Sequence, residues 1–330
     1  MPELPEVEVV RAGLHPAVTG AVVQRVEVLE PRSLRRHPGP EEDFVDRLTG
    51  ATIHSAVRRG KFLWFPYAPA SGEGDVHPAL VAHLGMSGQV LLRGRDQPDD
   101  RLLRIRLDLV HPTLGDVRLA FVDQRIFGSM ALDETEATPD GREAGYSGAA
   151  LLGSSLPVPL PDHGSETSPG DARSWATRIP HQVAHIARDP LDPAFDERLF
   201  FERLLARKSG VKRALLDQGL VSGIGNIYAD ESLWAAKIHF EQSCHTLSRR
   251  RAGLLLLEVR AVLYKALAEG GTSFDAQYVN VNGQSGYFSH SLNAYGQQGK
   301  PCPRCGTLIV REAFMNRSSH FCPRCQRLRP

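Results

Sequence analysis

Four cysteines near the end of the chain have the spacing of a metal site. They follow the pattern Cys302-x2-Cys305-x16-Cys322-x2-Cys325. Two Cys-x2-Cys pairs can turn four thiolates toward one ion, and a tetrahedral thiolate set suits zinc. Because such a set leaves no coordination position for a substrate, we expect one structural zinc ion per chain. A segment this short cannot build its own core, so the metal would organise it.

The N-terminus carries a second possible chemistry. Proline at position 2 permits removal of Met1, which would expose a secondary amine. An α-amine titrates near about pH 7.7–8.0, so a useful fraction is neutral and nucleophilic at neutral pH. Attack of the Pro2 amine on a sugar carbon would be covalent catalysis of the Schiff-base type, with Glu3 as acid–base partner. The local residues alone favour a simpler interpretation, a helix that starts at Pro5 with acidic side chains in its first turn.

Two further segments could meet a polyanion. The glycine-rich run Ser222–Asn226 precedes an expected helix, whose N-terminal N–H groups could bind a phosphate. Residues 297–330 carry seven Lys and Arg side chains against Glu312 alone, and the guanidinium fork suits phosphate. A plain turn between helices and a solvated basic tail are the alternative interpretations.

Composition restricts the class of protein. The net charge of the 330 residues is only +1, which by itself neither favours nor excludes nucleic acid. No apolar run approaches the roughly 20 residues that span a bilayer, and the first residues lack the order of a signal peptide. We therefore expect a cytoplasmic protein with reduced cysteines and no membrane partner. We also expect no nucleotide cofactor, and we expect a monomer.

The sequence divides into four consecutive parts. Residues 1–133 have short alternating apolar runs that predict a β-sandwich or barrel. Residues 134–178 are acidic and rich in Pro, Gly and Ser, which predicts a flexible insert or linker. Residues 179–296 have helical apolar spacing, and residues 297–330 carry the cysteines.

Apolar periodicity also predicts individual elements. Strands are expected over Ala21–Val28, Lys61–Tyr67, Leu80–His83, Gln89–Leu92, Leu102–Val110 and Val117–Val122. Helices are expected over Val7–His15, Phe195–Ala206, Val211–Asp217, Asn226–Ala236 and Leu247–Glu269.

Six motifs in one order resemble the formamidopyrimidine-DNA glycosylase family, also called 8-oxoguanine DNA glycosylase/AP lyase. They are Pro2-Glu3-Leu4-Pro5-Glu6-Val7, Arg59-Gly60-Lys61, His83-Leu84-Gly85-Met86-Ser87-Gly88, Asp123-Gln124-Arg125-Ile126-Phe127-Gly128, Gly223-Ile224-Gly225-Asn226-Ile227-Tyr228 and the four-cysteine tail. The resemblance covers nearly the whole chain except about 134–175. The related endonuclease VIII group usually begins Pro-Glu-Gly, so Leu4 favours the purine-specific branch.

The resemblance implies an α+β multidomain fold: an N-terminal β-sandwich, a helix-two-turn-helix domain and a C-terminal zinc finger. It implies a bifunctional enzyme of base excision repair that removes oxidised purines from duplex DNA and nicks the strand by β,δ-elimination. By position, the catalytic residues would be Pro2, Glu3, Lys61 and Arg317. The DNA-contacting residues would be Met86, Arg125, Phe127, Arg207, Lys212 and Asn226.

A flipped-out base leaves a gap in the stack that apolar and planar side chains can fill, which suits Met86, Phe127 and Arg125. Judged alone, Met86 and Phe127 would more often be core residues. The family often has a second basic residue where this chain has Ile126, and a His on the preceding strand that is missing here. These departures keep open a second hypothesis, a damage-binding protein without chemistry. A glycosylase for oxidised pyrimidines is a third hypothesis. The polar segment Gly271–Phe288 would suit a loop over the extruded base.

Overall fold

The computed structural model describes residues 2–72, 77–148, 174–272, 281 and 286–329. The chain forms two compact units that do not follow chain order. A β-rich unit contains residues 8–58 and 62–184. A helical unit contains the chain from residue 185 onward, together with the residues up to Val7 and the turn Arg59–Lys61. The helical unit therefore contains all four expected catalytic residues and three of the six expected DNA-contacting residues, Arg207, Lys212 and Asn226.

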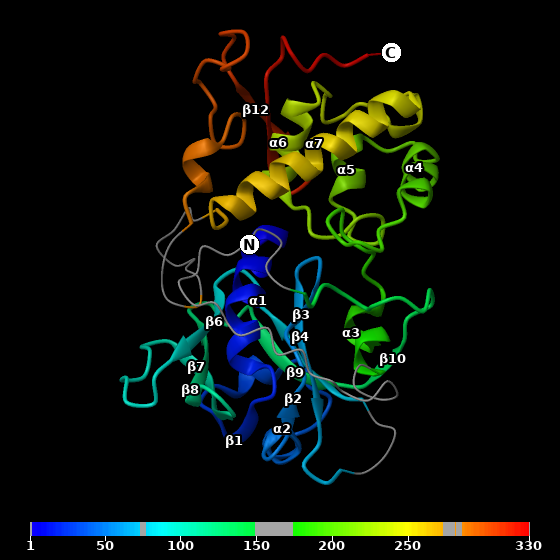
Figure 1. The fold of residues 1–330 in the computed structure, drawn as a ribbon. Coiled ribbons are helices and arrows are strands. Elements are labelled where there is room, and N and C mark those ends of the chain that lie inside the picture. The colour runs from blue at the N-terminus through cyan, green and yellow to red at the C-terminus, as the bar shows by residue number, and fades with distance from the viewer. Residues whose placement is uncertain (1, 73–76, 149–173, 273–280, 282–285, 330) are drawn as a thin grey trace. The chain divides into compact units, whose positions relative to one another are not determined.

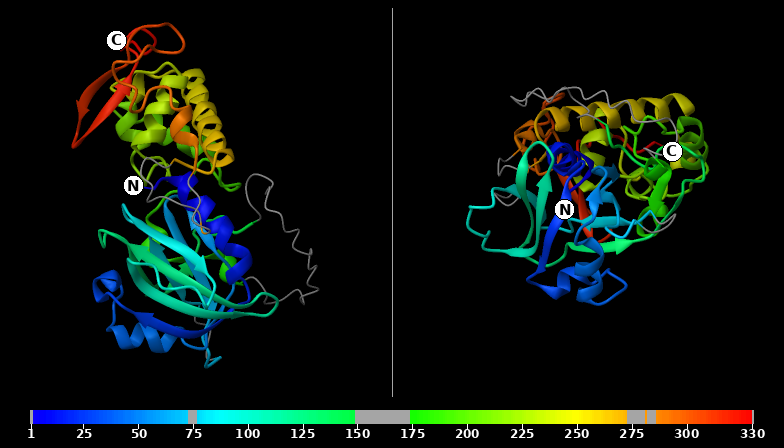
Figure 2. Two further views of the ribbon diagram at one scale, coloured as in Figure 1. Left: turned by 90° about the vertical axis from the view of Figure 1, so that its left-hand side faces the viewer. Right: turned by 60° about the horizontal axis from the view of Figure 1, so that its bottom comes forward.

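The β-rich unit is built on one continuous antiparallel path of strands, ordered β6-β8-β7-β1-β2-β4-β5-β9, with β3 paired to β4 (Figure 1). The strands are β1 (Val22–Val28), β2 (Thr52–Ile53), β3 (Val57–Arg59), β4 (Phe62–Ala68), β5 (Ala79–His83), β6 (Gly88–Arg93), β7 (Leu103–His111), β8 (Gly115–Asp123) and β9 (Ser129–Asp133). All six expected strands are present within one or two residues of their expected ends. The ribbon of β7 and β8 is the longest pairing (Figure 2).

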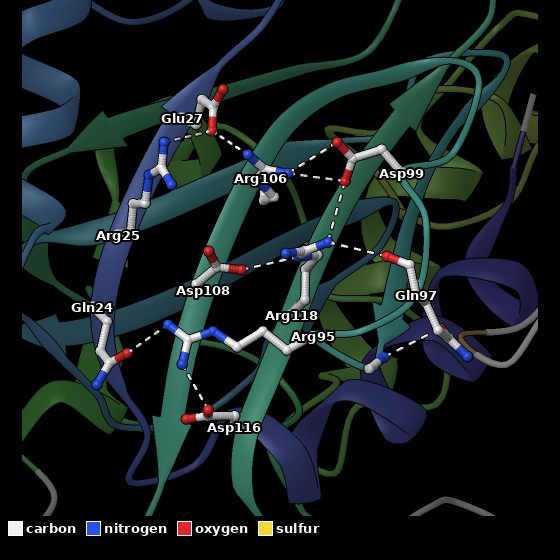
Figure 3. A network of polar contacts seen from close by, with 11 residues as sticks. Gln24, Arg25, Glu27, Arg95, Gln97, Asp99, Arg106, Asp108, Asp116 and Arg118 are labelled. Atoms are coloured by element: carbon white, nitrogen blue, oxygen red, sulfur yellow. Dashed lines mark hydrogen bonds and ion pairs between the residues drawn. The ribbon is translucent and has the colours of Figure 1, made fainter.

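Alternation along β7 separates a core face from a charged face. Ile105, Leu107 and Leu109 are at most 1% exposed. The intervening polar residues join a network with β1, β8 and the loop after β6 (Figure 3). Asp108 lies directly across from Arg118 and binds it at 3.0 Å. Ion pairs between facing residues of neighbouring strands stabilise this polar face.

Helices complete the β-rich unit. They are most of α1 (Leu4–Val18), η1 (Pro31–Leu34), α2 (Glu41–Leu48), η2 (Ser174–Thr177) and α3 (His181–Ala184). The helix expected over Val7–His15 is longer at both ends, and Pro16 lies inside its last turn. Proline there removes only one N–H from the final turn, which the helix tolerates.

The described flanks of the acidic segment form regular structure. Strand β10 (Thr135–Ala137) pairs with β11 (Arg178–Pro180). Tyr146 exchanges backbone hydrogen bonds with Arg58 at 2.8 and 3.0 Å. These pairings place the two described flanks of the segment in regular structure. The rest of the predicted insert or linker, residues 149–173, lies outside the described residues.

The helical unit holds α4 (Glu197–Leu205), α5 (Val211–Leu215), α6 (Asn226–Ala235), η3 (Cys244–Thr246), α7 (Arg249–Ala268) and η4 (Phe288–Ser291) (Figure 1). The four expected helices are all present. Helix α4 starts two residues after the expected Phe195, because the side chain of Asp196 caps it by accepting the N–H of Leu199. A hairpin of β12 (Val310–Phe314) and β13 (Arg317–Phe321) follows. Among the described residues, no helix has the length and apolarity to cross a bilayer.

Candidate active site

The carboxylate of Glu3 occupies the start of helix α6. Glu3 is 3% exposed, and it accepts the backbone N–H groups of Gly225 at 2.6 Å, Ile227 at 3.0 Å and Tyr228 at 3.3 Å. The partial positive charge of a helix N-terminus favours a carboxylate there. The sequence had suggested that these N–H groups could bind a phosphate. The structure corrects that expectation, because Glu3 already takes three of them.

The contact between the Glu3 carboxylate and the start of helix α6 requires glycine at position 225. A Cβ atom there would lie 2.4 Å from Cδ of Glu3, closer than real Cβ contacts. The neighbouring backbone adds a bond from the N–H of Leu4 to the carbonyl of Gly223 at 2.9 Å. The residues that follow Pro2 are thus tied to the glycine-rich turn, and Pro2 itself is buried.

The pKa values of Glu3 and Lys61 are both shifted from their ordinary values. Burial raises the pKa of Glu3 from an ordinary 4.5 to about 7, although the charge of Lys61 and the backbone N–H groups oppose the shift. Burial lowers the pKa of Lys61, while the charge of Glu3 raises it and that of Arg317 lowers it further. The ammonium of Lys61 donates to the carbonyl of Ile224 at 2.8 Å. A carboxyl group that titrates near neutral pH can both take and return a proton.

Glu6 and Tyr228 belong to this site, although the sequence showed Glu6 only as a first-turn acid. One oxygen of Glu6 accepts the N–H of Glu3 at 2.8 Å. The other accepts the hydroxyl of Tyr228 at 2.5 Å and the N–H of Thr272 at 2.7 Å. The signal that could have found this role is the spacing of Glu6 three residues after Glu3, which permits a capping bond from the third helical residue.

Asn226 and Arg317 lie on elements that are bonded to each other. The amide of Asn226 donates to the carbonyl of Ser318 at 3.1 Å, one residue beyond Arg317. Arg317 pairs with Phe314 at the turn of the zinc-finger hairpin and is exposed. The expected DNA contact Asn226 and the expected catalytic residue Arg317 are therefore brought to one region of the helical unit.

Lys212 departs from the expectation of a DNA contact. Its side chain is fully buried, and its ammonium lies 2.6 Å from Oδ1 of Asp230. It also donates to the Ser318 carbonyl at 3.0 Å and to Oγ of Ser319 at 2.8 Å. The second oxygen of Asp230 accepts the N–H of His320 at 2.9 Å. A buried lysine that holds these partners joins α5, α6 and β13 and has no surface left for a phosphate. Arg207, by contrast, is partly exposed and pairs with Asp217 at 2.7 Å.

The three expected gap-filling residues lie on two touching loops of the β-rich unit. Met86 is 45% exposed and Phe127 is 49% exposed, and Arg125 is also exposed. A Cβ atom on Gly85, whose φ is +62°, would lie 2.4 Å from the carbonyl carbon of Phe127. Large apolar side chains left exposed on closely packed loops are suited to insertion rather than to the core.

Buried Asp123 fixes the loop that carries Phe127. One oxygen accepts the Ser87 hydroxyl at 2.5 Å and the Arg125 N–H at 3.1 Å. The other accepts the N–H of Gly128 at 2.6 Å. The two loops therefore share one carboxylate. Sequence patterns do not indicate this role, because Asp123 looks like the polar end of a strand.

The four cysteines fit one zinc ion. Their sulfurs all lie within 4.8 Å of one another, and sulfurs bound to one tetrahedral zinc are expected about 3.8 Å apart. The indole N–H of Trp234 points to the sulfur of Cys302 at 3.4 Å, and the N–H of Cys325 to that of Cys322 at 3.4 Å. Such donors stabilise the thiolates that hold a metal. Cys302, Ile309 and Cys322 form a small core beside Trp234.

Family models match three consecutive parts of the chain. Residues 1–130 match the formamidopyrimidine-DNA glycosylase N-terminal domain, and residues 186–277 match the H2TH domain of the same enzymes. Residues 299–328 match a zinc finger found in these glycosylases and in isoleucyl-tRNA synthetase.

Curated relatives and solved structures agree with these matches. A formamidopyrimidine-DNA glycosylase of Leifsonia xyli is 57% identical over 99% of this chain and its own full length. One of Kineococcus radiotolerans is 50% identical over 99% of this chain and 97% of its own length. The Lactococcus lactis enzyme with abasic-site DNA aligns with a TM-score of 0.71 at 30% identity, over 98% of this chain and 99% of the other.

The site combines a buried proline at position 2, a buried carboxylate next to it and a four-cysteine cluster. Together with the helix-two-turn-helix domain, these features define a DNA glycosylase of base excision repair. The chain belongs to the formamidopyrimidine-DNA glycosylase family. Glycosylase and AP lyase activity are the known activities of that family. The expected α+β fold, structural zinc and DNA binding are thereby confirmed.

Proposed function

We propose that the chain excises oxidised purines, 8-oxoguanine and formamidopyrimidines, through a Schiff base on Pro2. The observation that carries the proposal is Glu3, a buried carboxyl group with a pKa of about 7 next to Pro2 and under the charge of Lys61. The proposal requires removal of Met1, because a proline nitrogen inside a peptide bond is no nucleophile.

The proposed reaction has three stages: base excision, elimination at the strand and hydrolysis of the covalent adduct. The Pro2 nitrogen attacks C1′ of the damaged nucleotide, the glycosidic bond breaks, and the base leaves with a proton. The sugar ring opens to an iminium, and Glu3 moves protons during these steps. Loss of a C2′ proton then breaks the C3′–O bond, and loss of a C4′ proton in a second elimination breaks the C5′–O bond. Water hydrolyses the iminium, which restores the amine and leaves a one-nucleotide gap with phosphate ends.

Other residues hold the DNA in this proposal. Lys61 binds a phosphate and assists the first elimination, and Arg317 grips the phosphates beside the lesion and supports the second. Asn226 and Arg207 contact the backbone. Met86, Arg125 and Phe127 fill the vacated stack, which their exposure supports. All these residues come from one chain, so we propose that a monomer acts, in the cytoplasm on chromosomal DNA.

Borohydride trapping on duplex DNA with 8-oxoguanine opposite cytosine tests the proposal. The reduced adduct should map to residue 2 after proteolysis. A protein with an uncleavable N-terminal extension should trap nothing, whereas a matched protein with a cleavable extension should regain trapping once cleavage exposes Pro2. Equal trapping with the extension in place, or an adduct mapped to a lysine, would contradict the role of Pro2.

A glycosylase for oxidised pyrimidines is the second candidate. The Lactococcus lactis enzyme was solved in complex with DNA containing an oxidised pyrimidine, at 30% identity and a TM-score of 0.72. A mutant of the same enzyme was solved with DNA containing a formamidopyrimidine of guanine. Excision rates on 8-oxoguanine and thymine glycol duplexes separate the two candidates. Family membership disfavours the third, a binding protein without chemistry.

A further inference from the structure

Arg35 binds the backbone of the loop that carries Phe127. One guanidinium nitrogen donates to the carbonyls of Ile126 at 2.7 Å and Gly128 at 2.8 Å. The other terminal nitrogen donates to the carbonyl of Phe127. A single side chain thus holds three successive carbonyl groups. The planar fork of arginine can do this, whereas the single ammonium of lysine cannot match it.

The backbone at Arg35 is held in place by the turn before it and by local hydrogen bonds. It follows the turn η1, in which Ser33 and Leu34 are buried. Its own N–H bonds to the carbonyl of Arg32 at 3.3 Å, and the next turn is closed by a 2.7 Å bond from His37 to Leu34. A side chain that starts from a fixed backbone can hold a loop in place rather than move with it.

The loop needs such support because Ile126 is strained. Its φ is +55°, in the left-handed region that β-branched side chains rarely adopt. Strain of this kind persists only where the surroundings over-determine the conformation. Asp123 binds the N–H groups of Arg125 and Gly128, and Arg35 binds the carbonyls. The backbone is therefore held from both sides.

We propose that Arg35 is a positioning residue that keeps Ile126 left-handed and so presents Phe127 and Arg125 to the gap left by the flipped base. The inference rests on the proposed role of Phe127 and Arg125. The guanidinium of Arg35 is directed to the backbone of this loop.

Four variants test the inference: Arg35→Ala, Arg35→Lys, Phe127→Ala and the double variant Arg35→Ala/Ile126→Asn. Asparagine tolerates left-handed φ, so it should lessen the need for the clamp. We expect both Arg35 single variants to lose about tenfold in single-turnover excision of 8-oxoguanine opposite cytosine. The double variant should recover most of that loss. Cleavage of an abasic site in a single strand, which has no stack to fill, should stay at the wild-type rate.

Arg32→Ala is the matched control, since Arg32 lies on the same turn, is 72% exposed at its side chain and forms its ion pair with Glu30. It should excise normally. A normal rate for Arg35→Ala together with an impaired Phe127→Ala would overturn the inference. A normal rate for Phe127→Ala would instead remove the proposed gap-filling role. A third outcome is full activity of Arg35→Lys together with a salt slope of DNA binding that is reduced by about one in Arg35→Ala. That outcome would make Arg35 a phosphate ligand and would overturn the positioning role.

Discussion

The carboxylate of Glu3 accepts the N–H of Gly225 at 2.6 Å, although 222 positions separate the two residues in the chain. This bond places an acid from the N-terminus at the start of helix α6. The positive end of the helix and Lys61 favour the charged form, and burial opposes it. The balance leaves the group titrating near neutral pH, which is what an acid–base catalyst requires.

The raised pKa of Glu3 predicts how stability depends on pH. Between pH 4.5 and about 7 the folded state keeps a proton on Glu3 that the unfolded chain has lost. Stability therefore falls as pH rises through this window. In Glu3→Gln this fall should disappear. The difference between the free energies of unfolding at pH 4.5 and at about pH 7 should therefore change by up to about 3 kcal/mol. Urea unfolding of both proteins at several pH values measures it.

The same variant should lose base excision by at least about a hundredfold, because the amide cannot carry a proton. Its binding to DNA with an uncleavable abasic-site analogue should remain. A pH dependence of stability equal to that of the wild type would show that Glu3 ionises normally. Normal excision by Glu3→Gln would remove its acid–base role.

Gly225→Ala should disable the site through one methyl group. The new Cβ would lie 2.4 Å from Glu3, so the carboxylate must leave the helix start. We expect a loss of base excision and a destabilisation of about 1–3 kcal/mol. Gly253→Ala is the control, because a Cβ there meets nothing within 4 Å and alanine favours a helix. That variant should be active and slightly more stable. Equal activity of the two variants would contradict the role of Gly225.

The sequence predicted elements better than it predicted contacts. Periodicity located six of the nine strands of the sheet and the helices α4 to α7, because burial of one face governs both. It missed α2, whose apolar content is small, and the strands β2, β3 and β9. Cysteine spacing sufficed for the zinc site, since four ligands within a short segment need no tertiary information.

Apolar periodicity does not predict contacts between residues that are far apart in the sequence. Nothing in the sequence pairs Lys212 with Asp230, so Lys212 looks like a surface cation until the structure buries it. Likewise Arg35 is one of many arginines, and only the fold brings it to the carbonyl of Ile126. Family resemblance supplied the candidate residues, whereas the hydrogen bonds that hold them follow only from the folded structure.

Lys212 should act on stability rather than on the salt dependence of DNA binding. Lys212→Met leaves Asp230 buried without its cation, which should cost about 3–5 kcal/mol. The double variant Lys212→Met/Asp230→Leu removes both charges and should recover part of this loss. Chemical denaturation measures both.

Salt titrations of DNA binding then distinguish the lysines and arginines. Arg317→Ala should reduce the slope by about one, while the Lys212 double variant should keep the wild-type slope. Lys208→Ala is the control for removal of an exposed lysine. A reduced slope in a stable Lys212 variant would mean that Lys212 reaches a phosphate after all.

Removal of zinc should unfold the finger and abolish tight binding of DNA. Metal analysis should find one zinc per chain, and Cys322→Ser should contain none, since Cys322 is fully buried in the four-sulfur cluster. The hairpin that carries Arg317 would then lose its anchor, because structural zinc contributes about 10–16 kcal/mol to such segments. The fluorescence of Trp234 should change, because its indole N–H faces Cys302. Cys244→Ser, a buried cysteine outside the cluster, should keep zinc and DNA binding. Tight DNA binding by zinc-free protein would show that the finger is dispensable.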